Sequence, residues 1–476
     1  MRIILLTMLF ALTSQFALAE TYYVDSHKGN DNNSGTQKNK AWKSIYKVNQ
    51  QTFKAGDKVL FKSGSVFTGA LEPKGNGEKN KPIIIDSYGK GAKPKIHGQG
   101  WKQHTLLLKN IEYWQVNNLF ITNLGKQPQP RRTGVTIEAN NIGELHGIVL
   151  NKLIIGHING VLKKKQGGGH GILVRSTGDE TQSRFIDLQL TNNYIHNSAR
   201  NGIGFKGYAN RKKWFPSLGV IIRGNLIEKV PGDGIVVVGT DGALIEGNIL
   251  RDFPDTLPEG DAAAGIWPWS ADNTLVQYNE VSGHKAKWDG QGFDADWNSV
   301  GTIIQHNYSH DNYGGFLLVC NNGNKYKQDI NIGTLRTIVR GNVSVNDGIR
   351  PYPTFKGMFS PTFHLTGPIE DTQIYDNLII IPKKGDKVDN TLVEMDNWGG
   401  PWPINTLFEN NQIYFEDELQ IKLKDIKDVL FKKNHFSKTV ANFDATGNTV
   451  AASNDFDLPQ LMRLAQQKLD ENNNYE

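Results

Sequence analysis

Short apolar segments alternate with polar turns along most of the chain, and the pattern repeats from about Tyr113 to Phe415. In each repeat a short apolar run leads to an asparagine, and another short apolar run follows. Successive asparagines lie 23 to 42 residues apart. Repeats of this length predict a solenoid, and the strand-forming composition of the runs predicts a β-solenoid. The ten asparagines are Asn118, Asn151, Asn193, Asn225, Asn248, Asn279, Asn307, Asn342, Asn377 and Asn411.

The recurrent asparagine has a physical explanation. Asparagine tolerates the left-handed backbone conformation, and its side chain bonds to nearby backbone groups. Stacked asparagines can also hydrogen-bond to one another along the solenoid. The variable spacing indicates that each coil carries a loop of its own length, and such loops commonly form the binding face.

The two ends of the chain differ from the repeats. A basic residue, a short apolar run and Ala17-Leu-Ala19 predict a signal peptide over residues 1–19, so we expect a secreted or periplasmic protein. The β-helix domain is expected over residues 20–455, with a helix in Ala41–Gln51 capping its first coil. Residues 456–476 are expected to form an amphipathic helix and a disordered tail that starts at Asn472.

Composition narrows the range of partners. The net charge is +5 over 476 residues, without a basic block, so we expect no nucleic-acid binding. Beyond the signal segment no stretch is long and apolar enough to cross a membrane, and we expect no membrane insertion. Cys320 is the single cysteine, which excludes an internal disulfide. We expect the protein to be a monomer.

The N-terminal sequence resembles a known group of enzymes. Tyr22-Tyr-Val-Asp, Trp42-Lys-Ser-Ile and Ala55-Gly-Asp-Lys-Val-Leu-Phe are similar to the start of many secreted right-handed parallel β-helix enzymes. These are the pectate-lyase-like polysaccharide lyases and glycoside hydrolases. The resemblance implies an all-β fold, a right-handed parallel β-helix, and a polysaccharide substrate. It does not specify the reaction, because one fold hosts many chemistries.

A second strand in each coil can be aligned on a glycine. The residue after the glycine is always apolar, so that column and the one two residues later are predicted to face the core. Leu318 and Cys320 are assigned to inward positions by this alignment, and Cys320 is predicted to be a core residue. The columns between them are then predicted to face outward, and they contain Arg175, Lys206, Trp267, Trp269, Asp294 and Asp296.

The outward tryptophans and aspartates lie on neighbouring coils, which suggests a sugar-binding groove. Tryptophan rings stack on the apolar faces of sugars, and paired carboxylates can cleave a glycosidic bond. The leading hypothesis is a glycoside hydrolase without a cofactor, with Asp294 and Asp296 as catalysts. Further catalytic candidates in the neighbouring loops are Lys285, His310 and Asp311. The candidate substrate-binding residues are Trp267, Trp269, Lys206, Arg175, Trp288, Glu394 and Asp396.

Two other functions fit the same residues. In a polysaccharide lyase, Ca²⁺ would be held by Asp289, Asp294 and Asp296, and Lys285 or Lys206 would be the base. The run from Asp289 to Asp294 is similar to the calcium-binding sequence of one pectate lyase family. The third possibility is a glycan-binding surface protein without catalytic activity.

Export gives the first testable prediction. We expect cleavage after Ala19, because small residues at Ala17 and Ala19 fit the signal peptidase. N-terminal sequencing of the exported protein should begin at Glu20, and a sequence that begins at Met1 would contradict cleavage.

Overall fold

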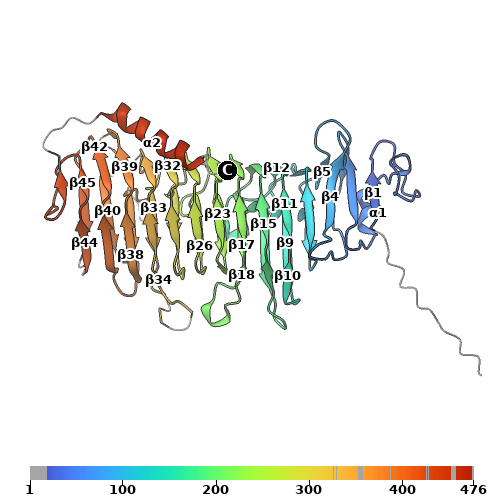
Figure 1. Cartoon of the computed structure of the whole chain (residues 1–476), viewed down its shortest axis with the longest axis horizontal. Coiled ribbons are helices and arrows are strands. Elements are labelled where there is room, and N and C mark those ends of the chain that lie inside the picture. The colour runs from blue at the N-terminus through green and yellow to red at the C-terminus, as the bar shows by residue number, and fades with distance from the viewer. Residues whose placement is uncertain are drawn as a thin grey trace, which may run out of the picture.

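The computed structural model describes residues 19–324, 326–327, 330–351, 358–385, 387–424, 426, 428–451 and 457–473. The described chain winds into a parallel β-helix, so the fold predicted from the repeats is confirmed (Figure 1). Three long sheets run along it. One has 15 strands, from β1 (Thr21–Val24) to β44 (Val429–Lys432), and another has 14 strands, from β3 (Val66–Thr68) to β46 (Thr449–Val450).

The third sheet has 11 strands and carries the outward residues singled out from the sequence. Neighbouring strands in it are parallel and come from successive coils. Its strands are β6 (His104–Lys109), β9 (Arg132–Asn140), β13 (Gly169–Thr177), β17 (Asn201–Lys206), β21 (Ile235–Val238), β26 (Ile266–Trp269), β30 (Phe293–Ala295), β33 (Leu317–Cys320), β37 (Phe363–Thr366), β40 (Thr391–Asp396) and β43 (Gln420–Leu423).

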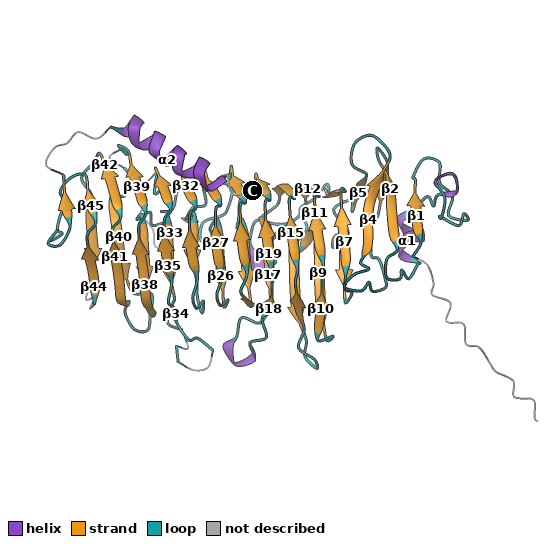
Figure 2. Cartoon of the chain, viewed as in Figure 1, coloured by secondary structure: helices purple, strands orange, loops and turns teal. Residues whose placement is uncertain are grey.

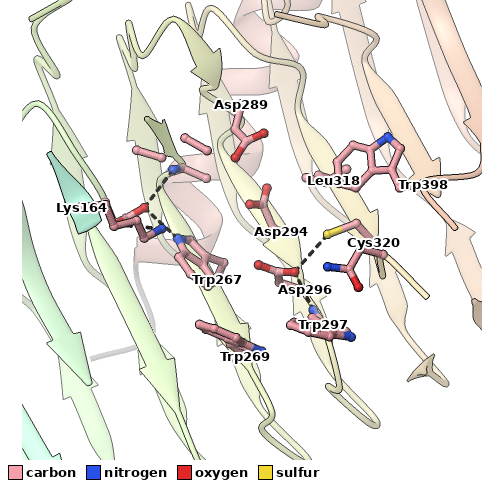
Figure 3. A pocket seen from close by; sticks show the side chains of 15 residues that line it. Lys164, Trp267, Trp269, Asp289, Asp294, Asp296, Trp297, Leu318, Cys320 and Trp398 are labelled. Carbon is pink, nitrogen blue, oxygen red and sulfur yellow. Dashed lines mark hydrogen bonds and ion pairs between the residues drawn. The ribbon is translucent and has the colours of Figure 1, made fainter. Parts of the chain in front are cut away.

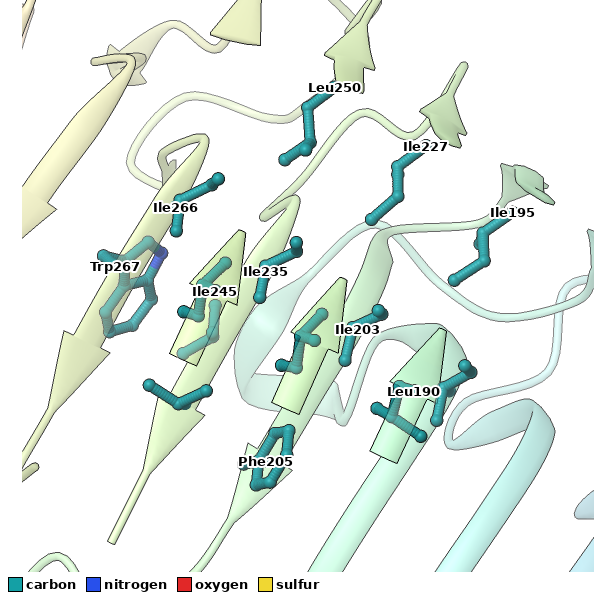
Figure 4. Close-up of a cluster of buried hydrophobic side chains, with 14 of the residues drawn as sticks. Leu190, Ile195, Ile203, Phe205, Ile227, Ile235, Ile245, Leu250, Ile266 and Trp267 are labelled. Carbon is teal, nitrogen blue, oxygen red and sulfur yellow. The ribbon is translucent and has the colours of Figure 1, made fainter. Parts of the chain in front are cut away.

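Apolar columns fill the interior of the β-helix. Ile203, Ile235 and Ile266 are in register on β17, β21 and β26, and all three are fully buried (Figure 4). Each side chain packs on its equivalents in the next coils, ~4.8 Å away. The alternation of inward and outward residues predicted from the sequence holds on these strands, and it presents every second side chain to the outside.

A ladder of asparagine side chains joins the coils from Asn193 to Asn448. Each side-chain amide donates to the Oδ1 of the next asparagine at 2.8–3.0 Å. Asn118 and Asn151 were wrongly included, because Leu119 and Leu153 occupy the equivalent inward position. The left-handed residue is the one before each ladder asparagine, for example Tyr278 with φ of 55°. The ladder asparagine itself serves as the hydrogen-bonding residue.

The two helices lie in different places (Figures 1 and 2). The helix α1 (Ile45–Asn49) buries Ile45 and Val48 at the first coil, within the segment predicted to be helical. The helix α2 (Leu458–Asn473) contributes Leu461 and Ala465 to a small cluster on the outer face of the 14-stranded sheet. It is therefore a peripheral helix. Most of the predicted disordered tail lies outside the described residues. Among those residues no helix is long and apolar enough to span a membrane.

The glycine alignment fails at two coils. In the later one, β37 starts at Phe363, which fills the core position assigned to Met358, the residue after Gly357. In the earlier one the shift is a single residue. Phe293 pairs with Leu317, one residue later than the alignment expected, so Leu318 and Cys320 point outward. Phe316 still fills the core, at the corner before the strand. Two consecutive glycines, Gly314 and Gly315, precede this strand, and the second one misled the alignment. The prediction that Cys320 faces the core is therefore wrong.

The asparagine ladder gives the second prediction. Changing Asn279 to Ala removes the acceptor of the buried Asn248 backbone amide, one acceptor of the Asn248 side-chain amide, and the side-chain donor to the carbonyl of Ile245. We expect a loss of roughly 3 kcal/mol in the free energy of unfolding, because unpaired buried polar groups are costly. Urea unfolding measures this loss. The exposed Asn32, changed to Ala, is the control and should be nearly neutral, whereas equal stability of the two variants would contradict the role of the ladder.

Candidate active site

The outward residues of β26 and β30 line a pocket of about 330 Å³ on the 11-stranded sheet. Asp289, Asp294 and Asp296 lie in a row along it, with Trp267 and Trp269 on one side and Cys320 and Trp398 on the other (Figure 3). Asp294 is only 3% exposed, so the pocket is more enclosed than the exposed sheet expected from the sequence. The structure thus brings both predicted pairs, the tryptophans and the aspartates, into one pocket.

The three carboxylates come from two elements. Asp294 lies on β30 and Asp296 follows it two positions later, so alternation sends both side chains to the same face. Asp289 lies on β29 (Trp288–Asp289), which pairs with β25 (Ala262–Ala263) above the sheet. The backbone of Asp289 is left-handed, with φ of 57°. The same backbone conformation recurs at the corners of many coils, so at Asp289 it forms the turn that directs the carboxylate into the pocket.

The three carboxylates differ in their hydrogen bonds. Asp296 Oδ1 accepts from the Trp297 amide at 2.6 Å and from the Cys320 thiol at 3.0 Å. Burial raises the pKa of Asp296, while these two hydrogen bonds lower it and limit the rise. Asp294 Oδ1 is buried without a hydrogen-bond partner in the described structure. Burial, and then the neighbouring Asp289, raise the pKa of Asp294 well above its ordinary value.

Asp289 titrates near neutrality. Burial is the main cause, Lys164 opposes it, and the charge of Asp296 adds to it, so that the pKa of Asp289 is raised to about 7. A carboxyl group with this pKa can hold a proton at neutral pH and also release it. This property is what a general acid or base requires.

A fourth carboxylate, Asp233, forms the base of a charged network at the edge of the pocket. Arg200 donates to it at 2.9 Å, and the ammonium of Lys164 lies 3.7 Å away. Burial alone would raise its pKa, but Lys164 and Arg200 outweigh burial and lower the pKa of Asp233 to about 2. Asp233 also accepts a hydrogen bond from the indole of Trp267 at 3.2 Å. It therefore orients this ring in the pocket wall.

Aromatic rings form the walls around the carboxylates. Trp269 stacks on Trp297 with ring centres 5.9 Å apart, and Trp267 is tilted against Trp269 at 6.4 Å. Lys164 lies over the Trp267 ring, 4.9 Å from its centre. The buried indole nitrogens of Trp269 and Trp297 have no hydrogen-bond partner in the described structure. These rings offer stacking surfaces to a sugar.

Several predicted catalytic residues lie elsewhere. Lys285 is exposed and does not line the pocket. His310 lies on β32 (Tyr308–His310) in the 14-stranded sheet, where its Nδ1 bonds to Asp311 at 2.8 Å. The sequence could not show this, because loop residues that are close along the chain turn the corner onto another sheet. The placement of Lys285, His310 and Asp311 in the site is therefore wrong.

The predicted binding residues divide into three groups, the first of which, Trp267 and Trp269, lines the central pocket. Lys206 and Arg175 line neighbouring pockets on the same sheet. Trp288 and the pair Glu394 and Asp396 do not line the central pocket, which was wrongly extended over them. Asp396 instead bonds to His364 at 3.0 Å. In the described part of the chain no three His, Cys, Asp or Glu side chains are grouped so that they could hold a metal ion.

Sequence reasoning missed Asp233, Lys164 and Trp297. A signal for Asp233 existed, because the residue before the aligned glycine forms a hydrogen-bonded row in successive coils, His170, Asn201 and Asp233. Alternation along the strand does not predict whether the side chains of this row point inward or outward, because the chain bends at the glycine. Lys164 comes from η2 (Lys164–Gln166), in the loop before β13, and Asp233 precedes β21, two coils further on. No local pattern marks Lys164.

Comparison with known proteins supports the fold. The family model for the right handed beta helix region matches residues 166–334, which include the pocket strands. The A-module of a mannuronan C-5 epimerase from Azotobacter vinelandii shares the fold, with a TM-score of 0.54 and 12% identity over 84% of this chain and 90% of that one.

Two more similar proteins are lacto-N-biosidases. The crystal structure of the GH136 lacto-N-biosidase from Eubacterium ramulus matches with a TM-score of 0.67 and 27% identity, over 83% of this chain and 68% of that chain. The lacto-N-biosidase of Bifidobacterium longum subsp. longum is 28% identical over 490 residues. That match covers 82% of this chain and 28% of the relative, so the chain spans less than a third of the relative's length.

The enclosed carboxylates give the third prediction. Burial and the neighbouring Asp289 raise the pKa of Asp294 in the folded protein above its value in the unfolded chain, so folding disfavours the ionised form and this residue destabilises the protein at neutral pH. Asp294→Asn should raise the melting temperature by roughly 2 °C or more at pH 7. The gain should vanish near pH 3.5, where both states are protonated.

Thermal unfolding at the two pH values measures this difference. Asp179→Asn, at an exposed position, controls for the loss of a charge and should leave the melting temperature nearly unchanged. A lower melting temperature for Asp294→Asn at pH 7 would contradict the account of a protonated, buried carboxyl group.

Proposed function

We propose that the protein is a secreted or periplasmic glycoside hydrolase that cleaves a glycan in the pocket of Asp289, Asp294 and Asp296. The observation that carries this proposal is the grouping of three carboxylates in different hydrogen-bonding environments between tryptophan rings. Glycoside hydrolysis needs two carboxyl groups with separate roles on either side of one bond. The similarity to two lacto-N-biosidases supports the same reaction class.

The roles follow from the environment of each carboxyl group. Asp289, with a pKa of about 7, is the general acid that protonates the glycosidic oxygen. Asp296 receives two hydrogen bonds that favour its ionised form, so it is the nucleophile or the base that activates water. Asp294 stays protonated between them and donates a hydrogen bond to the sugar. This assignment replaces the initial pair Asp294 and Asp296 with Asp289 and Asp296.

The tryptophans position the sugar. Rings on neighbouring coils present faces to the pocket, and the hydrogen bond from Trp267 to Asp233 restricts rotation of one ring. A fixed stacking surface reduces the freedom of the bound sugar and holds the scissile bond at the carboxylates. The names of the relatives make a lacto-N-bioside the first substrate to test.

The lyase alternative is less well supported. Lys285, one of its two proposed bases, lies outside the pocket. Lys206 is on β17, three strands from β30, which is ~14 Å at normal strand spacing. A base at this distance does not reach a proton held beside Asp296. The hydrolase therefore remains the first choice, with activity independent of added Ca²⁺ and insensitive to a chelator.

The fourth prediction concerns the two carboxylates with active roles. Asp289→Asn and Asp296→Asn should each lower kcat at least 100-fold on p-nitrophenyl lacto-N-bioside or another cleaved glycan, because each removes one half of the acid–base or nucleophilic chemistry. Release of p-nitrophenol measures the rate. Asp179→Asn should retain full activity, and full activity in both active-site variants would refute the assignment.

The fifth prediction concerns pH. The general acid must be protonated, so kcat/KM should fall as pH rises through about 7, the pKa of Asp289. Asp296 must be ionised, so the rate should also fall on the acidic side. A pH–rate profile measures both limbs. In Asp289→Asn the alkaline limb should disappear from the residual activity, and an unchanged limb would assign it to another group.

A further inference from the structure

A second pocket on the same sheet is lined by cations. Its volume is about 330 Å³, and its lining includes Arg131, Lys164, Lys165, Arg175 and Lys206. None of the described residues that line it is an aspartate or a glutamate. The whole chain is nearly balanced, with 53 basic and 48 acidic residues. Five basic side chains around one cavity are therefore a local concentration of charge, which the composition of the chain does not explain.

Only part of this charge is neutralised within the protein. Lys164 pairs with Asp233, and Arg175 pairs with Glu138 at 3.1 Å. Glu138 also holds Lys109 at 2.9 Å, so it serves two cations. The side chains of Arg131, Lys165 and Lys206 make no ion pair or hydrogen bond with another described residue. Three cations at one cavity thus remain available to a ligand.

Two details indicate that the cavity is suited to an anion. The Nε of Arg175 is buried without a hydrogen-bond partner in the described structure, although the same guanidinium bonds to Glu138. Partial burial, and then the like charges of Arg175 and Arg131, lower the pKa of Lys206. The mutual repulsion of these groups would be relieved by a bound anion. Guanidinium groups bind carboxylates and sulfates through two parallel hydrogen bonds.

The cationic pocket is continuous with the catalytic one. A smaller cavity of about 160 Å³ lies between them and shares Trp267 and Trp269 with the catalytic pocket. It shares His170 and Lys206 with the cationic pocket. The floor between them is made by β21, which presents Val236 and Val238. A groove therefore runs along the sheet from Asp296 to Arg175, across ~19 Å or four strand spacings.

We propose that this cationic pocket is a subsite for an acidic sugar, so that the substrate is a glycan with a carboxylate or sulfate ester on a residue away from the cleaved bond. This inference rests on the proposed function, because cleavage at the carboxylates is what orients the glycan along the groove. The chemistry shared by the two possible substituents is a compact oxyanion held by Arg131, Arg175 and Lys206. The neutral part of the glycan lies on the valines and tryptophans.

Binding of matched glycans tests this proposal separately from catalysis. The ligands are oligosaccharides in three forms that share one core: neutral, capped with sialic acid, and sulfated. Affinities are measured by calorimetry in wild-type protein and in Asp296→Asn, which prevents turnover. We expect at least one acidic form to bind 10-fold or more tightly than its neutral partner at 25 mM salt, with the preference reduced at 250 mM salt. The form that binds identifies the substituent.

Substitutions at the pocket provide the controls. Lys206→Gln and Arg131→Gln should each weaken binding of the acidic form about 5-fold or more and leave the neutral form unchanged. Lys285→Gln removes an exposed charge outside the pocket and should change neither. Equal affinity for neutral and acidic forms would overturn the proposal. A preference for the acidic form that is unchanged in both Lys206→Gln and Arg131→Gln would also overturn it. If wild-type protein binds acidic glycans through Lys206 but does not cleave them, the proposed subsite is supported and the proposed hydrolase activity is contradicted.

Discussion

The structure depends on the register between successive coils. The parallel strands and the asparagine ladder hold each coil against the next, so a side chain that faces outward on one coil lies ~4.8 Å from its equivalents. This constraint places Trp269 beside Asp296, although the two come from separate coils. It also makes the sheet a rigid support on which a site several coils wide can be built, with no movement of the scaffold required.

The carboxyl groups of the active pocket lower the stability that the register between coils provides. Three carboxyl groups with raised pKa values lie within one cavity, and one oxygen of the buried Asp294 has no partner among the described residues. The opposing charge comes from Lys164 and Arg200, but it is directed mainly to Asp233. Asp233 is thus ionised and fixed, while Asp289, whose pKa is raised to about 7, can exchange a proton at neutral pH. Sites arranged in this way are commonly less stable than a packed surface of the same size.

The fold and half of the site could be predicted from the sequence, and both for one reason. Alternation along a strand and the repeat length determine which residues face outward, and both are visible in the sequence, so Trp267, Trp269, Asp294 and Asp296 were identified. Loop residues follow no such rule. His310 was close to the site along the chain but lies on another sheet, whereas Lys164 is distant along the chain and lies over Trp267. The register at Cys320 was missed because Phe316, and not Gly315, occupies the position equivalent to Gly292.

The most direct test of the central claim is a crystal structure of the Asp296→Asn variant with an uncleaved oligosaccharide. We expect the sugar to span the pocket with its glycosidic oxygen about 3 Å from the Asp289 carboxyl group, the distance needed for proton transfer. The anomeric carbon should face residue 296, and a ring should stack on Trp267 or Trp269. A glycan bound to another face of the β-helix, or one whose glycosidic oxygen lies far from Asp289, would contradict it.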